Sequence, residues 1–302
     1  MQKLSINLSL SLALMVGVAV PVSATEISQP TLAPASVYLD ATSKTTFAAE
    51  MEAKHDANLK NGKIKRGTIA EIDNLMMQST FATGSEKEKI NQQLETLGVY
   101  EYAPSSSTSN AIVPFSTSGD VTLTTPTVFY ESWENTWTVT CGGNWRNSNW
   151  NEQLFLGNVG GSDAFGVGFT NTTKPYKSYV IRSSAYITNQ SNTKSSSTTN
   201  RSDGDGSKGF GFRLQDSIIS INAGSSYDYI GYRWYGSSTY DFWFGNYSGV
   251  ATGYYIHTWS SAQITGIKFG VDGKSAGIEV TISSGDKSFT AYSNDKTFGV
   301  YP

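Results

Sequence analysis

The chain has 302 residues and a formal net charge of −3, and only 38% of its residues are hydrophobic. This length suits one large domain or two modest ones, and without a polybasic block neither nucleic acid nor an anionic membrane is favoured as a partner. Cys141 is the only cysteine, which excludes an intrachain disulfide. Core packing must therefore hold the fold, and 7 Trp, 17 Tyr and 14 Phe supply large areas for burial.

The first 24 residues have the pattern of a secretory signal peptide. Lys3 precedes an apolar stretch, and the small residues 22–24 fit cleavage before Thr25. Serines and Pro21 interrupt the stretch, whereas a membrane-spanning helix needs about 20 apolar residues. The pattern predicts a secreted, extracellular protein, and its scarcity of cysteine favours a bacterial one.

Helical signals follow the predicted signal peptide. The pairs Thr68-x-x-Glu71 and Ser85-x-x-Glu88 have the form of capping boxes, and each precedes apolar residues at helical spacing. Gly98 suits the end of the second helix. Such short helices are marginal alone, so we expect them to need a partner surface.

These signals divide the chain into segments. We interpret residues 25–102 as a helical pro-region or accessory segment, and keep open that they form a small layer packed permanently on the rest. Residues 103–119 are rich in Ser, Thr and Pro, which is the composition of a linker.

Residues 120–302 carry short β-rich runs separated by Gly, Asn, Asp and Ser. About twelve closely spaced runs without intervening helices predict an antiparallel, jelly-roll-like β-sandwich. Asp272-Gly273 and residues 284–286 lie where hairpin turns are needed, and the polar stretch 189–208 is expected to be a mobile loop. The predicted strands are 127–131, 136–141, 164–170, 177–187, 209–214, 217–222, 227–235, 239–245, 253–259, 263–271, 277–282 and 287–293.

The segment 227–259 holds 13 aromatic residues in 33 positions. We expect some of these rings to face solvent, where flat rings stack on sugars and nearby carboxylates bind hydroxyls. Strand alternation assigns Tyr240, Phe242 and Phe244 to the core and leaves Asp241 and Trp243 outside. The alternative is that the rings are core and cross-strand pairs.

A second aromatic cluster lies within residues 129–152, where Trp and Asn alternate through a Gly-rich loop. This loop forms either a sugar-binding rim or a plug over one end of the sandwich. Together the two clusters give the predicted ligand-binding residues, which are Trp243, Asp241, Tyr232, Trp234, Trp145 and Trp150.

A polysaccharide hydrolase would need two carboxylates across a cleft, about 5–5.5 Å apart for retention or roughly 6.5–9.5 Å for inversion. Glu131 is the best acid/base candidate because it shares a strand face with the apolar Phe129 and Trp133. Asp241 is its predicted catalytic partner, and Asp228 and Glu279 are alternatives.

We expect no cofactor or metal. The only lead for Ca²⁺ is Asp203 with Asp205, but the third acidic position and the distal Glu of a calcium loop are absent, so a polar turn is the simpler interpretation. No cluster of His or Cys suggests zinc. Cys141 with His257 could form a thiol dyad, although a single cysteine ending a β run is usually a buried apolar residue.

These patterns favour a secreted bacterial protein that binds a glycan or cell-wall surface through aromatic residues, without catalysis. Two alternatives stay open. One is a secreted polysaccharide hydrolase that uses paired carboxylates. The other is a β-rich membrane-active or antibacterial toxin whose stretch 183–207 unfolds into a hairpin, with residues 25–102 as its inhibitor.

Overall fold

The fold is described from a computed structural model. It describes residues 41–102, 119–150, 156–170, 172, 178–193, 195–221, 226–246, 248–259, 262–283 and 288–299. The predicted signal peptide lies outside these residues, as do the predicted turn at 284–286 and all of the predicted linker except Gly119. The described residues belong to one unit, 36–302.

Three helices open the described part of the chain, α1 (Ala41–Lys60), α2 (Ile69–Phe81) and α3 (Gly84–Thr96). The cap of α2 is confirmed, because the Thr68 hydroxyl accepts the Glu71 backbone N–H at 3.1 Å. The cap predicted for α3 is wrong, since this helix begins after Thr83 and that side chain makes no capping bond. Gly98 follows the helix at φ +77°, a conformation that favours glycine.

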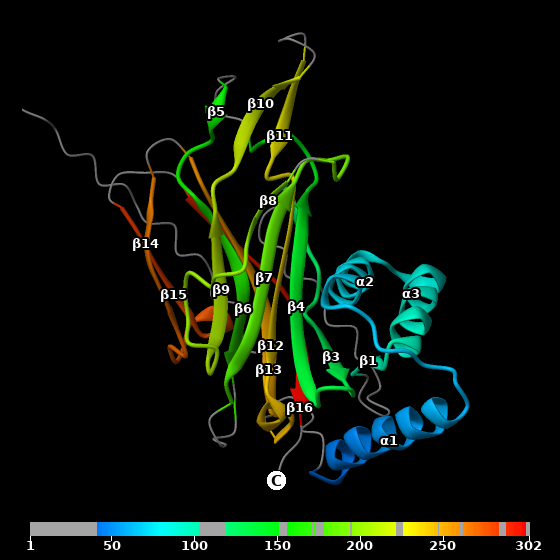
Figure 1. Cartoon of the computed structure of the whole chain (residues 1–302). Helices are drawn as coiled ribbons and strands as arrows, with labels where there is room; N and C mark the ends of the chain where they lie inside the picture. The colour runs from blue at the N-terminus through cyan, green and yellow to red at the C-terminus, as the bar shows by residue number, and fades with distance from the viewer. Residues whose placement is uncertain are drawn as a thin grey trace, which may run out of the picture. The chain divides into compact units, whose positions relative to one another are not determined.

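The remaining described elements are mainly antiparallel β-strands, as predicted (Figure 1). The largest sheet has the order β1-β3-β4-β12-β7-β8, with β2 also pairing β4. Its strands are β1 (Val99–Glu101), β2 (Val121–Leu123), β3 (Thr127–Glu131), β4 (Thr136–Trp145), β7 (Val180–Thr188), β8 (Ser195–Thr198) and β12 (Arg233–Tyr240).

A four-stranded sheet has the order β16-β13-β6-β9. It contains β6 (Asp163–Thr170), β9 (Gly209–Leu214), β13 (Ser248–Thr258) and β16 (Ser288–Gly299). Two smaller sheets consist of β5 (Gly157–Asn158), β10 (Ser217–Ile221) and β11 (Ser226–Ile230), and of β14 (Ile264–Phe269) with β15 (Ile278–Ile282). The Asp272-Gly273 turn prediction is confirmed by the antiparallel pairing of β14 and β15 around it.

Alternation along β4 explains how the two larger sheets share a core. Trp137, Val139 and Cys141 belong to the main apolar cluster, which also includes residues of β6, β9 and β13. Across this core the rings of Trp234 and Tyr255 stack with centroids 3.8 Å apart. The opposite face of β4 is polar, and its Thr140 hydroxyl lies 2.8 Å from the Thr80 hydroxyl of α2.

The predicted strand 227–235 is wrong, because the chain breaks at Gly231, which has φ +145°. Strands β11 and β12 on either side of the break belong to different sheets. The predicted strand 239–245 also ends early, since the chain leaves β12 after Tyr240 and forms a short 3₁₀ helix, η2 (Phe242–Asn246). Of the three rings assigned to the core, Tyr240 and Phe244 are buried as predicted, whereas Phe242 is 47% exposed.

The polar stretch 189–208 contains structure that the sequence did not predict. Strand β8 within it pairs with β7, and Asp203 forms an isolated bridge with Gly211. Among the described helices, none combines the length and the apolar character needed to cross a bilayer.

Candidate functional site

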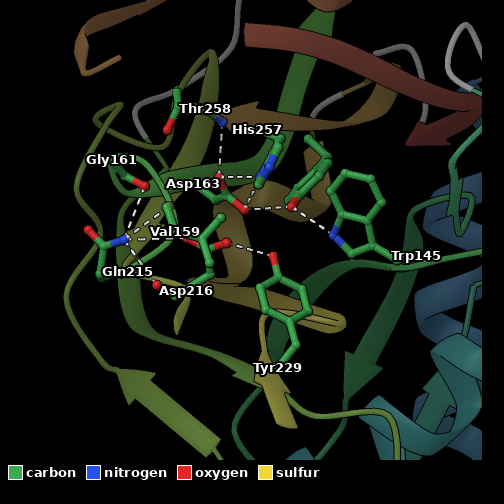
Figure 2. Close-up of polar contacts among 10 residues, drawn as sticks. Trp145, Val159, Gly161, Asp163, Gln215, Asp216, Tyr229, His257 and Thr258 are labelled. Carbon is green, nitrogen blue, oxygen red and sulfur yellow. Dashed lines mark hydrogen bonds and ion pairs between the residues drawn. The ribbon is translucent and has the colours of Figure 1, made fainter. Parts of the chain in front are cut away.

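The strongest cluster of chemically active side chains is Asp163, Asp216 and His257, drawn in Figure 2. Asp163 begins β6, Asp216 lies between β9 and β10, and His257 is near the end of β13. All three are buried, and one potential ligand atom from each lies within 4.8 Å of the others. The cluster therefore joins three segments that are far apart in the sequence.

Asp163 is the acceptor on which its neighbours converge. His257 Nδ1 lies 2.9 Å from both of its carboxylate oxygens. The Tyr255 hydroxyl donates to Oδ2 at 2.5 Å, and the Thr258 backbone N–H donates to Oδ1 at 3.2 Å. Trp145 extends the chain of contacts, because its Nε1–H donates to the Tyr255 hydroxyl at 3.2 Å.

Asp216 is the second carboxyl of the cluster. It accepts a hydrogen bond from the Tyr229 hydroxyl at 2.6 Å. Burial, and then the charge of Asp163, raise the pKa of Asp216 well above its ordinary value. The cluster thus places two carboxyl groups together where little water can screen them.

The walls around His257 are aromatic. The Trp145 and Trp259 rings lie 4.9 and 4.6 Å from the imidazole, with their planes at 80° and 89° to it. His257 Nε2 is buried and has no hydrogen-bond partner within the described part of the chain. Buried polar atoms normally have such a partner, so this nitrogen calls for an explanation.

Two of the rings predicted to bind ligand lie in the core. Trp145 and Trp234 are 0% and 1% exposed, and they support the buried cluster through Tyr255. Trp150 is half-buried and stacks on Tyr229 with centroids 3.9 Å apart. Tyr232 is half-buried and packs against the core.

Asp241 lies next to exposed rings, although not the predicted ones. Its carboxylate accepts the Ser178 hydroxyl at 2.9 Å and the Tyr179 backbone N–H at 3.2 Å. Tyr179 is 62% exposed and Phe242 is 47% exposed. The backbone of Trp243 belongs to η2, but its side chain lies outside what the structure describes.

Glu131 is buried in an ion pair. The Arg182 Nη2 donates to both of its oxygens at 2.9 Å, and the Thr138 hydroxyl donates at 2.5 Å. Arg182 also lies 3.6 Å from Asp73 of α2. Glu131 and Asp241 therefore have separate sets of partners among the described contacts.

The two aspartates of the predicted calcium lead are also engaged by the protein. Asp203 pairs with the Arg213 guanidinium, whose Nε donates at 2.8 Å. Asp205 accepts the backbone N–H and the hydroxyl of Ser207 at 2.8 and 2.7 Å. Partial burial opposes its ionisation, but these hydrogen bonds prevail and lower the pKa of Asp205.

Comparison with known protein families, with curated proteins and with solved structures finds no match to this chain. The arrangement of the residues themselves is thus the basis for assigning a role to either site.

Proposed function

We propose that the protein is a secreted bacterial β-sandwich that binds carbohydrate or cell-envelope material without catalysis. The observation that carries the proposal is a pair of exposed rings near Asp241: Phe242 follows it in the chain, and Tyr179 is hydrogen-bonded to it through the backbone. In this proposal the two larger sheets form the sandwich, and the export signal at residues 1–24 delivers the protein to its ligand.

The backbone supports a preorganised site at these rings. The Asp241 N–H donates to the Tyr179 carbonyl at 3.1 Å, and the Tyr179 N–H donates back to the Asp241 carboxylate at 3.2 Å. Each partner lies beside a strand of the largest sheet, β7 or β12. A site fixed in this way loses little conformational entropy when a ligand binds.

The chemistry of the surface suits a sugar. An aromatic ring offers a flat apolar face, and a carboxylate has about four acceptor positions. Asp241 uses two of them in the hydrogen bonds from Ser178 and Tyr179, which leaves capacity for ligand hydroxyls. Ile181, 57% exposed and two residues beyond Tyr179, adds an apolar side chain to this part of the surface.

Binding to insoluble glycans tests the proposal. The purified chain is incubated with cellulose, chitin and peptidoglycan, and the bound fraction is measured for wild type, Tyr179→Ala and Phe242→Ala. The matched control is Tyr227→Ala, because Tyr227 is also 56% exposed but lies on β11 in a different sheet. A lost ring–sugar contact of about 1 kcal/mol weakens binding roughly fivefold. The affinity of each site variant for the glycan should therefore fall at least about fivefold.

Three results would contradict the proposal. The first is that wild type binds none of these materials. The second is that Tyr179→Ala and Phe242→Ala bind as well as wild type. The third is that Tyr227→Ala loses as much binding as the site variants do. Release of reducing sugar would favour the hydrolase alternative, and dye leakage from liposomes would favour the toxin alternative.

A further inference from the structure

We propose that Asp163, Asp216 and His257 bind one divalent transition-metal cation, such as Zn²⁺ or Mn²⁺. The three residues offer one ligand atom each within 4.8 Å, and all are buried. Ligand atoms bound to one cation at about 2.0–2.2 Å lie at most about 4.4 Å apart, so the three side chains would close in slightly around a bound ion. The inference does not depend on the proposed carbohydrate site.

The donor set selects the kind of cation. Ca²⁺ and Mg²⁺ prefer oxygen ligands throughout, whereas an imidazole nitrogen with carboxylate oxygens suits zinc and related metals. His257 Nδ1 faces both oxygens of Asp163 at 2.9 Å, a separation that two adjacent ligands of one ion can have. Figure 2 shows the imidazole directed at the Asp163 carboxylate.

Hydrogen bonds from outside the set hold the carboxylates in position. The Tyr255 hydroxyl donates to Asp163 at 2.5 Å, and the Tyr229 hydroxyl donates to Asp216 at 2.6 Å. Metal sites in proteins commonly have such supporting hydrogen bonds, which fix the direction of each ligand. The phenols of two different strands, β13 and β11, thus orient two carboxylates toward one region.

The unpaired nitrogen of His257 is the independent observation. When Nδ1 carries the proton and donates it to Asp163, Nε2 is left as a buried acceptor without a donor among the residues that the structure describes. When a cation binds Nδ1 instead, the proton moves to Nε2. Aromatic rings accept weak hydrogen bonds from N–H groups, and the Trp145 and Trp259 rings are neighbours of the imidazole, with centroids 4.9 and 4.6 Å from its own.

Charge balance points the same way. Two carboxyl groups in a nearly water-free interior repel one another when both are ionised. A divalent cation held by the two carboxylates would neutralise both at once. Because the three residues meet only in the folded chain, metal binding should stabilise that fold.

The test starts with the purified full-length chain, stripped with a chelator and confirmed as folded by circular dichroism. Zn²⁺, Mn²⁺ and Ca²⁺ are titrated separately by calorimetry, and metal content is measured after dialysis. We expect about one equivalent of Zn²⁺ or Mn²⁺ and weaker binding of Ca²⁺. At about 100 times the dissociation constant, the bound cation should raise the melting temperature by roughly 5 °C or more.

Variants locate the cation. Asp216→Asn and His257→Gln should each reduce affinity by at least tenfold. The matched control is His55→Gln, because His55 is the other histidine of the chain and bonds Ser132 instead, with Nδ1 2.6 Å from that hydroxyl. This control should bind as wild type does.

Several outcomes would overturn the proposal. They are a folded wild type that binds neither Zn²⁺ nor Mn²⁺, tighter binding of Ca²⁺ than of both, and unchanged binding in folded Asp216→Asn and His257→Gln. If these variants do not fold, the visible absorption spectrum of wild type loaded with Co²⁺ tests the proposal, since its bands report which ligands bind the ion. Bands typical of oxygen-only coordination, or no bands, would also overturn it.

Discussion

In the ion-pair network at Arg182, we expect loss of the cation to destabilise the fold more than loss of the Glu131 charge. Arg182→Met leaves Glu131 buried without its cation and Asp73 beside it, whereas Glu131→Gln leaves Arg182 in contact with Asp73 at 3.6 Å. Breaking a buried pair costs about 3–5 kcal/mol. The Arg182 side chain is 23% exposed, so water partly screens the pair. We therefore expect Arg182→Met to lower the free energy of unfolding by about 2–4 kcal/mol. For Glu131→Gln, which keeps a hydrogen-bonding group in place, we expect about 1–2 kcal/mol.

The loss in Arg182→Met should also depend on pH. Burial raises the pKa of Asp73, Arg182 lowers it, and the charge of Glu131 raises it. Removing the guanidinium therefore raises this pKa further. A group whose pKa is higher in the folded state loses stability as pH rises through that folded pKa, so the variant should be less stable at pH 8 than at pH 5, relative to wild type.

Urea unfolding followed by tryptophan fluorescence measures both variants. Lys268→Met is the matched control, because Lys268 pairs with Glu279 at 3.4 Å with both side chains well exposed, and its loss should cost less than about 1 kcal/mol. Two results would contradict this prediction. One is an equal loss of unfolding free energy in Glu131→Gln and Arg182→Met, and the other is a loss in Arg182→Met no larger than that in the control.

Two further predictions concern single residues. Thr68→Ala should destabilise the chain by about 1 kcal/mol in urea, because the Glu71 N–H loses its cap, and a cost below the error of the measurement would contradict this role. Cys141 is buried, and burial raises its pKa to about 12. Its thiol should therefore resist a thiol reagent at pH 8 in the native chain and react once urea unfolds it, and rapid native labelling would show that the core position is wrong.

The fold class could be predicted because its signals are local. The cap at Thr68, the stop at Gly98 and the short β-rich runs each depend on a few neighbouring residues. Strand predictions were wrong where a local sequence pattern continues although the backbone changes direction. Alternation of rings runs through Gly231 without interruption, although the backbone there turns and sends β11 and β12 into different sheets.

The buried cluster could not be predicted because its members meet only through strand register. Ala164 of β6 pairs with Ile256, which brings the next residue of β13, His257, beside Asp163. Asp163 in turn pairs with Leu214 of β9, two residues before Asp216. The available signal was the position of each aspartate at the end of an apolar strand, and this signal gives no information on pairing.

Exposure of individual rings was also beyond the sequence. Trp145 and Trp234 are among the largest side chains, and the space between two sheets buries them fully. Tyr179 and Phe242 are exposed because they lie where β7 begins and just after β12 ends. Composition identified many aromatic residues, but which of them reach solvent depends on their place in the folded sheets, as Tyr227, 56% exposed within β11, also shows.

Strand β1 has a consequence for proteolysis. It follows the helices in sequence, yet it pairs with β3, and its Val99 packs with Phe129 in an apolar cluster that also includes Leu97. The Tyr102 N–H adds a bond to the Val128 carbonyl at 2.7 Å. A protease that cuts the chain after Tyr102 breaks one covalent bond but not this ladder. The severed helical segment would then stay attached as a non-covalent subunit, and its release would require a separate event that pulls β1 from the sheet.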